Sequence, residues 1–309
     1  MIGVIRSVIG TPADVQIQNC ITYGGTLTSS SSTGSVATGG FVGTYSNKTL
    51  ATISKCEIID ATLNTSCPTG QEAIIGGFFG EMSYGSNVTS MTFNDCRNEG
   101  MRFDHGASNA PKIGGIVGDG TTGGSGTTLT IANCIVNDMV NTMESGAVTT
   151  YEGSFVGYKE YDSTCSISNS VTTSSTVGGN LHAGNLTTTN NLLNASLSDL
   201  TTLSTFTSRS FDFTTTWTES PFGNAPILNF DEVTEGNPAT VAAGEVLDLM
   251  VLALNDDLTL EANASGYAQL KADYIAGNGE VTEQQYTATE GWTMVSSPFA
   301  TSVSSAGDF

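Results

Sequence analysis

Basic side chains are scarce in this sequence. The 309 residues include 9 Lys and Arg against 30 Asp and Glu, which gives a formal net charge of −21 at pH 7. Nucleic acids and anionic membranes are bound through clustered Lys and Arg, so this composition argues against both as partners. Divalent cations are suitable counter-ions for an acidic surface. We therefore expect no cofactor, with calcium as the one ion that the charge would accommodate.

Long apolar runs are absent as well. The longest, residues 246–254, contains Asp248 and is far shorter than the about 20 apolar residues that cross a bilayer. The 6 cysteines include no C-x-x-C pair of the kind that binds zinc. The sequence thus predicts neither a membrane-spanning helix nor a zinc site.

The chain contains instead a unit of about 38 residues that recurs at least four times. Its first mark is Gly-Gly-Phe-Val-Gly at residues 39–43, which returns with small changes at 76–80, 114–118 and 153–157. A unit this short cannot bury its own apolar side chains, so it must stack on its neighbours. Residues 1–3 align with 41–43, and we therefore expect the chain to be a portion of a longer protein that carries the targeting signals elsewhere.

A strand that ends on cysteine is the second mark of the repeat. Apolar and polar residues alternate up to a cysteine at 15–20, 51–56, 91–96 and 129–134, and 165–170 repeats the pattern with Ser170 in its place. This alternation predicts a strand with one buried face, and its recurrence predicts that the units stack in register. The side chains expected to form the core ladder are Ile17, Cys20, Ile53, Cys56, Phe93, Cys96, Ile131, Cys134 and Ile167.

Together these marks predict an all-β fold. We expect a parallel β-helix, or solenoid, of about five rungs over residues 1–180, followed by a smaller β-rich module. The glycines are expected at sharp corners, where a side chain would clash. A β-sandwich or a propeller is the main alternative, but the two-residue hairpin turns typical of both, such as Asn-Gly, are largely absent.

The cysteine column has two interpretations. Adjacent rungs lie near the separation that disulfide bonds permit, so neighbouring ladder cysteines could be bridged. Small buried thiols also stack without bonding, and the last unit has Ser170 where the others have cysteine. We favour free core thiols, with disulfides as the alternative.

The periodicity fades after about residue 180. Residues 181–230 carry aromatic side chains that we expect to cap the open end of the solenoid, with an aromatic ligand platform as the alternative. These capping aromatics are Phe211, Phe213, Trp217 and Phe230. Residues 231–309 contain 13 acidic residues and 1 basic residue, and we expect them to form a separate acidic β-rich module.

The glycine motif followed by an Asn-Cys strand resembles the GLUG-type repeats of bacterial surface adhesins. The resemblance covers roughly residues 1–175, and residues 212–228 look like the closing sequence that often follows such repeats. Residues 266–271 and 291–298 resemble stretches of Bacteroidota surface proteins exported by type IX secretion. The resemblance implies an extracellular, cell-surface location and a role in attachment.

Enzymatic function is the first alternative, because parallel β-helices also include polysaccharide-degrading enzymes. The notable polar cluster comprises Arg97, Arg102, Asp104 and His105. Asp256 and Asp257 are paired acids, but a turn between strands explains them equally well. His105 and His182 have no catalytic motif around them.

Ice binding is the second alternative, because it uses flat arrays of threonine on a β-helix face. The column Thr52, Thr92 and Thr130 fits such an array. The neighbouring outward column breaks its regularity, with Gln18, Ser54, Asn94, Ala132 and Ser168. Of these three functions, we expect a non-enzymatic structural or adhesive one. Exposed strands at the open ends of a solenoid favour self-association in a homo-oligomer or filament, and surface glycans or other cells are further expected partners.

Overall fold

The chain is described from a computed structural model in these segments: residues 2–6, 15–46, 50–82, 90–106, 111–120, 128–143, 151–159, 164–176, 178–181, 186–220, 225–229, 239–254, 258–277 and 281–284. It divides into two compact units, Met1–Phe230 and Asp231–Phe309.

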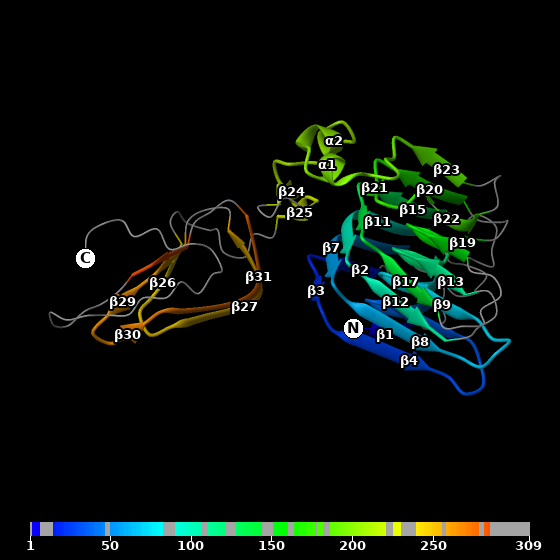
Figure 1. Cartoon of the computed structure of the whole chain (residues 1–309), viewed down its shortest axis with the longest axis horizontal. Helices are drawn as coiled ribbons and strands as arrows, with labels where there is room; N and C mark the ends of the chain where they lie inside the picture. The colour runs from blue at the N-terminus through cyan, green and yellow to red at the C-terminus, as the bar shows by residue number, and fades with distance from the viewer. Residues whose placement is uncertain are drawn as a thin grey trace. The chain divides into compact units, whose positions relative to one another are not determined.

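Four parallel sheets build the first unit (Figure 1). Sheet A contains β1 (Ile2–Arg6), β6 (Val42–Ser46), β10 (Phe79–Met82), β14 (Val117–Asp119), β19 (Val156–Lys159) and β22 (Gly178–Leu181). Sheet B contains β2 (Val15–Gln18), β7 (Leu50–Ile59), β11 (Ser90–Glu99), β15 (Thr128–Ala132), β20 (Thr164–Ser168) and β23 (Leu186–Thr189), with β3 (Ile21–Tyr23), β16 (Ile135–Asn137) and β21 (Val171–Thr172) on the same sheet. Sheet C contains β4 (Thr26–Ser30), β8 (Thr62–Ser66), β12 (Arg102–His105) and β17 (Val140–Met143). Sheet D contains β5 (Val36–Gly39), β9 (Ala73–Gly76), β13 (Lys112–Gly114) and β18 (Tyr151–Gly153).

The chain visits these sheets in the order A, B, C, D and returns to sheet A one rung further on. This path makes a parallel β-solenoid, which confirms the predicted fold class. Sheets C and D hold only 4 strands each, so there are fewer complete turns than the five expected. Strands β22 and β23 continue sheets A and B as far as Thr189, beyond the boundary expected near residue 180.

Sheet B carries the apolar ladder. Ile53 lies in register with Ile17 on one side and with Phe93 on the other. Phe93 lies opposite Ile131, which lies opposite Ile167. Burial of these like side chains over one another contributes about 25 cal/mol per Å² of apolar surface. The ladder ends at the exposed Thr188, the register partner of Ile167, so a polar residue occupies its last position.

The residue before each ladder cysteine bends the strand. Asn19, Lys55, Asp95, Asn133 and, before Ser170, Asn169 have φ between 51° and 54°, the left-handed region. Asn and Asp adopt this conformation at lower cost than other residues with a side chain, because their short polar groups bond locally. The Asn-Cys and Asp-Cys dipeptides of the repeat therefore mark a corner of the solenoid.

The glycine motif forms a turn between sheet D and sheet A that lies inside the solenoid. A Cβ atom on Gly80 would lie 2.7 Å from the backbone nitrogen of Thr38 in sheet D. One on Gly118 would lie 2.7 Å from the backbone carbon of Ile75. Since real side chains do not tolerate such separations, only glycine lets sheets A and D approach backbone to backbone.

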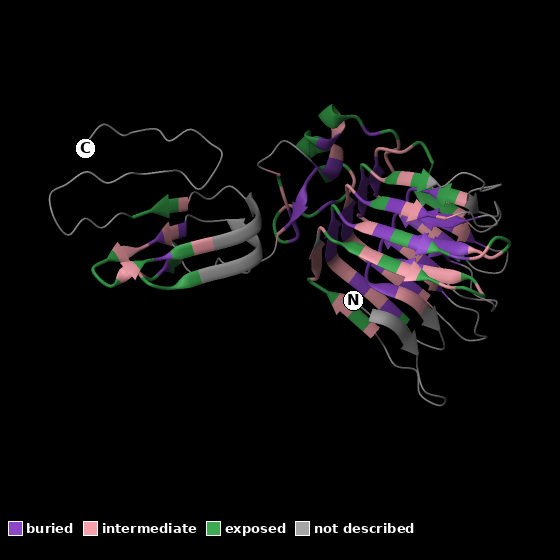
Figure 2. Cartoon of the chain, turned by 60° about the horizontal axis from the view of Figure 1, so that its bottom comes forward, coloured by how far each residue is buried: buried purple, intermediate pink, exposed green. Residues whose placement is uncertain are grey.

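Sheets A and D together form a buried layer between sheets B and C. The rings of Phe79 in sheet A and Phe93 in sheet B lie 5.5 Å apart, edge to face. On the other side, Thr65 of sheet C donates a 2.9 Å hydrogen bond to Thr38 of sheet D. Figure 2 shows the buried residues concentrated on strands within this stack. The predicted sharp corner exists, but it points into the core.

All six cysteines are free thiols. Cys56 and Cys96 are register partners, and the Cys134 Sγ donates to the Phe93 carbonyl at 3.7 Å. Burial raises the pKa of the Cys56 thiol to about 12, against hydrogen bonds that lower it. Ser170 takes the cysteine position in the last unit, where its hydroxyl donates to the Ser168 carbonyl. The structure contains the thiol form of the ladder, which is the form favoured from the sequence.

The second unit is also built mainly from parallel strands. Strands β26 (Ala239–Val241), β28 (Leu258–Leu260) and β32 (Val281–Glu283) form one sheet, and β27 (Val246–Leu254) pairs with β31 (Gln269–Gly277) in another. A short antiparallel pair, β29 (Ala262–Asn263) and β30 (Gly266–Tyr267), connects them. The described residues of the module expected after residue 230 are thus β-rich, with strands between Ala239 and Glu283.

Substitution of Gly118 tests the backbone contact between sheets A and D. Gly118→Ala should lower the free energy of unfolding by about 3 kcal/mol or more, because the methyl group has no space and backbone must move. Gly34→Ala is the control, since a Cβ there would meet only the Ser31 hydroxyl at 3.9 Å. Denaturant unfolding of both variants measures the difference, and equal stabilities would contradict the close packing.

Candidate functional site

The outward face of sheet B is the most regular surface of the first unit. Thr52, Thr92 and Thr130 lie in register on adjacent strands, between Gln16 and Ser166. Up to the corner at Lys55, Asp95 and their equivalents, the outward residues of the described strands are Gln16, Gln18, Leu50, Thr52, Ser54, Ser90, Thr92, Asn94, Thr128, Thr130, Ala132, Thr164, Ser166, Ser168, Thr187 and Thr189. The corner residues Lys55 and Asp95, which are half-buried and charged, adjoin this set. None of these sixteen carries a charge, although the chain as a whole has a net charge of −21. We call these residues the hydroxyl face.

The spacing of the hydroxyl face follows from strand geometry. Equivalent residues on neighbouring strands lie about 4.8 Å apart, and alternate residues along one strand about 6.6 Å apart. Some of the hydroxyls bond to each other, since Thr164 Oγ1 donates to Thr128 Oγ1 at 3.2 Å. The face therefore presents a two-dimensional array of donors and acceptors held by the backbone.

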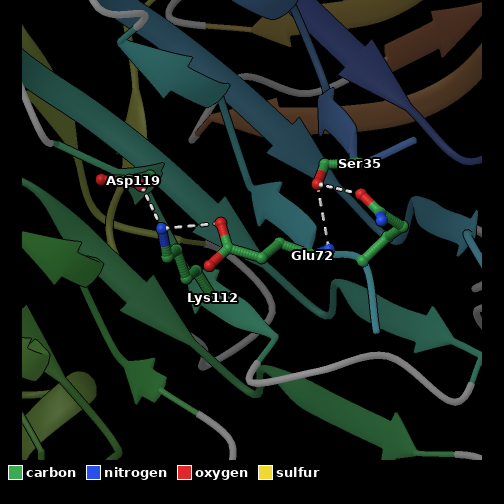
Figure 3. A network of polar contacts seen from close by, with 5 residues as sticks. Ser35, Glu72, Lys112 and Asp119 are labelled. Carbon is green, nitrogen blue, oxygen red and sulfur yellow. Dashed lines mark hydrogen bonds and ion pairs between the residues drawn. The ribbon is translucent and has the colours of Figure 1, made fainter. Parts of the chain in front are cut away.

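A charged cluster lies where sheet D begins and sheet A ends (Figure 3). Lys112 Nζ donates to Asp119 Oδ2 at 2.7 Å and to Glu72 Oε2 at 3.0 Å. The same ammonium lies 4.3 Å from the centre of the Tyr158 ring. Burial alone would lower the pKa of Lys112, but Asp119 and Glu72 outweigh it and the pKa is raised. The lysine is thus held in its charged form.

Two carboxylates of this region lie on adjacent rungs. Glu81 and Asp119 are register partners in sheet A. Burial raises the pKa of Glu81, and the nearby Asp119 carboxylate raises it further, against the opposing effect of Lys112. Each residue directly follows the last glycine of its motif, so alignment of the repeats would have located the pair. Neither residue was among those expected from the sequence.

A second buried ion pair links the solenoid to the segment that follows it. Glu57 and Arg97 are register partners, both almost fully buried, and their charged atoms lie 3.4 Å apart. Arg97 also pairs with Glu99. Glu57 Oε1 accepts a 2.6 Å hydrogen bond from the Leu228 backbone. Burial raises the pKa of Glu57 and outweighs Arg97 and Leu228, which lower it.

The expected capping segment runs along the side of the solenoid at this point. It includes α1 (Leu197–Leu200), α2 (Leu203–Thr207), and the antiparallel pair β24 (Trp217–Thr218) and β25 (Ile227–Leu228). Trp217 Nε1 donates to Asp95 Oδ1 at 3.0 Å, in the third cysteine unit, and Leu228 reaches Glu57 in the second. These lateral contacts differ from the lid over the open end that we expected, because the side chains of Asp95 and Glu57 accept hydrogen bonds from Trp217 and Leu228 along the side of the solenoid.

Most of the expected aromatics do form one cluster. The ring centres of Phe211 and Trp217 lie 5.0 Å apart, and Phe206 contacts both Phe211 and Phe213. Phe206, which was not among the aromatics expected from the sequence, is fully buried. Phe230 lies outside the described residues.

The polar cluster considered for catalysis is not assembled. Arg97 faces Glu57, whereas Arg102 is exposed on sheet C. His105 is buried, and its Nδ1 lies 3.3 Å from the Gly106 carbonyl. Asp104 lies on the outward side of the same strand, between Arg102 and His105 in sequence. His182, Asp256 and Asp257 lie outside the described residues.

Within the described segments, no group of three or more His, Cys, Asp and Glu side chains is placed to hold a metal ion. In the same segments, no helix is long and apolar enough to cross a membrane. Comparison of the chain with protein families, with curated proteins and with solved structures finds no match. The function is therefore inferred from the residues and contacts of the chain itself.

The raised pKa of Glu81 makes a prediction about pH. Its folded-state pKa lies above the ordinary glutamate value of 4.5, so its contribution to stability is complete below that value and is lost as the pH rises through the folded-state pKa. Glu81→Gln should match the wild type near about pH 4 and exceed it near about pH 8. The gain should be a fraction of a kcal/mol, because solvent screens the partly exposed carboxylate. Urea unfolding at both values measures it, with the exposed Glu152→Gln as control; a gain that does not change with pH would contradict the assignment.

The lateral segment makes a second prediction. Trp217→Phe should lower the free energy of unfolding by about 1–2 kcal/mol, because Asp95 loses a partner. Asp95→Asn keeps both the acceptor oxygen and a residue that tolerates positive φ, and it should unfold at the wild-type denaturant concentration or above. A greater loss in Asp95→Asn than in Trp217→Phe would show that the carboxylate charge, not the hydrogen bond, holds the segment.

Proposed function

We propose that this chain is a non-enzymatic, extracellular segment of a cell-surface protein, and that it mediates attachment through the hydroxyl face of sheet B. The observation that carries the proposal is the absence of charge from the sixteen described outward residues of that face, in a chain of net charge −21. The resemblance to GLUG-type adhesins and to Bacteroidota proteins exported by type IX secretion favours the same role.

Neutral surface glycans are the partners that suit this face. Hydroxyl and amide side chains can exchange hydrogen bonds with sugar hydroxyls without removing a charge from water, which would be costly. The acidic charge elsewhere on the chain repels anionic partners and keeps the protein soluble. Many weak contacts repeated along a rigid array add up when the ligand is itself repetitive.

Self-association is a further part of the proposal. Parallel sheets that end in unpaired strands offer backbone donors and acceptors to another copy, so homo-oligomers or filaments are the expected assemblies. Thr188 at the end of the ladder is exposed and polar, which limits apolar association at that position.

The enzymatic alternative rests on Glu81 and Asp119. Paired carboxylates on adjacent rungs are the groups that glycoside hydrolysis uses. Lys112, however, already pairs with Asp119 at 2.7 Å, which leaves that carboxylate engaged rather than free to act on a substrate. Turnover of a polysaccharide by the purified chain would displace the attachment proposal.

Lysine substitutions test the hydroxyl face. Thr92→Lys with Thr130→Lys places two charges on neighbouring rungs of sheet B. Binding to neutral glycans or to cells should fall at least about tenfold, since the ammonium groups must be desolvated. The matched control is Thr28→Lys with Asn64→Lys, exposed register partners on sheet C. A glycan array and a cell-adhesion assay give the readout, and equal losses from both pairs would reject the face as the binding surface.

Ice binding is a second candidate for the same face, and the register of Thr52, Thr92 and Thr130 favours it. Ala132 and Asn94 still interrupt the neighbouring column, as the sequence indicated. Thermal hysteresis that disappears in the sheet B lysine variant and persists in the sheet C variant would replace glycan attachment by ice binding.

A further inference from the structure

A separate pocket lies between the solenoid and helix α1. Its cavity volume is about 370 Å³, which falls within the range of small-molecule sites. One wall is polar and the other is apolar. The polar wall consists of Asn137, Asp138 and Thr173, and the apolar wall of Ala195, Leu197 and Leu200.

The polar wall contains an unused acceptor. Asn137 is only 4% exposed, and among the described residues its Oδ1 has no hydrogen-bond partner. A buried acceptor without a donor is unfavourable, so a ligand that supplies a donor there gains affinity. The exposed Asp138 adjoins it with φ of 51°, and its backbone nitrogen donates to Thr173 Oγ1 at 3.2 Å. This bond fixes the corner that presents the carboxylate.

The apolar wall is held in place by the helix. Leu197 is 66% exposed, although Leu200 one turn away is buried. A capping box between Ser196 and Asp199 stabilises the start of α1. Ala195 N donates to the Thr172 carbonyl at 3.0 Å, which ties the helix to the last rungs of sheet B. The exposed leucine therefore belongs to a supported surface.

We propose that this pocket binds a primary ammonium group at the end of an alkyl chain, the chemistry of a lysine side chain on a partner protein. The ammonium has three donors and no acceptor. It donates to Asn137 Oδ1 and pairs with the Asp138 carboxylate, while its methylene stem packs on Leu197 and Leu200. Anions are excluded by Asp138, and a purely apolar ligand leaves the Asn137 acceptor unpaired. The site is distinct from the hydroxyl face and does not depend on its function.

Titration of the isotope-labelled full chain with N-acetyl-lysine methylamide, followed by amide chemical shifts, tests the site. Saturable shifts should centre on Asn137, Asp138 and Leu197. The norleucine analogue, which has a similar stem and no ammonium, should bind at least about tenfold more weakly. Absence of shifts at these residues at millimolar ligand, or equal affinity for both compounds, would overturn the proposal.

Matched variants separate this pocket from general attraction to an acidic surface. Asp138→Asn keeps a residue that tolerates positive φ and should weaken lysine binding about fivefold to tenfold. Asp60→Asn changes the equivalent exposed corner of an earlier turn, with φ of 52°, and should leave binding unchanged. Leu197→Ser should weaken binding of both compounds. Equal losses from Asp138→Asn and Asp60→Asn would assign the binding to diffuse charge and reject the pocket.

Discussion

Contact between the backbones of sheets A and D is the constraint on which the first unit depends. In each turn the D strand and the following A strand pack against each other at a glycine motif. These packed strands fill the interior that sheets B and C enclose. A Cβ on Gly76 would lie 1.7 Å from the Phe79 carbonyl oxygen, so the turn admits no side chain. The aromatic residues of the motif, such as Phe78 and Phe79, then provide the volume that the glycines leave out.

This interior layer also decides where charge can lie. The turn itself contacts apolar and amide side chains such as Ile58 and Asn98, so charged groups occur where the D strands begin and the A strands end. Lys112, Glu72, Glu81 and Asp119 all belong to that region. Burial raises the pKa of Glu81, whereas Asp119 and Glu72 outweigh burial and raise the pKa of Lys112. Because Lys112 pairs with Asp119 and Glu72, we interpret the cluster as structural rather than reactive.

Much of the fold could be predicted from periodicity, because every rung repeats the same physical requirement. The ladder of Ile53, Phe93 and Ile131 follows from alternation with a period of two and from its recurrence at one position. The candidate site was harder to predict from the sequence. Arg97 and His105 are eight residues apart in sequence, yet one faces the lateral segment and the other the core, which no local pattern indicates.

The sequence by itself determined that the units stack in register, since an alternating strand shorter than a domain can bury its apolar face only against copies of itself. It also determined which residues face outward on sheet B. Only the tertiary structure decided that the glycine turn lies in the core and that Trp217 donates a hydrogen bond to Asp95, because both depend on which surfaces meet across separate turns. The same holds for the pocket at Asn137, whose walls come from three segments that are separate in sequence, at residues 137–138, 173 and 195–200.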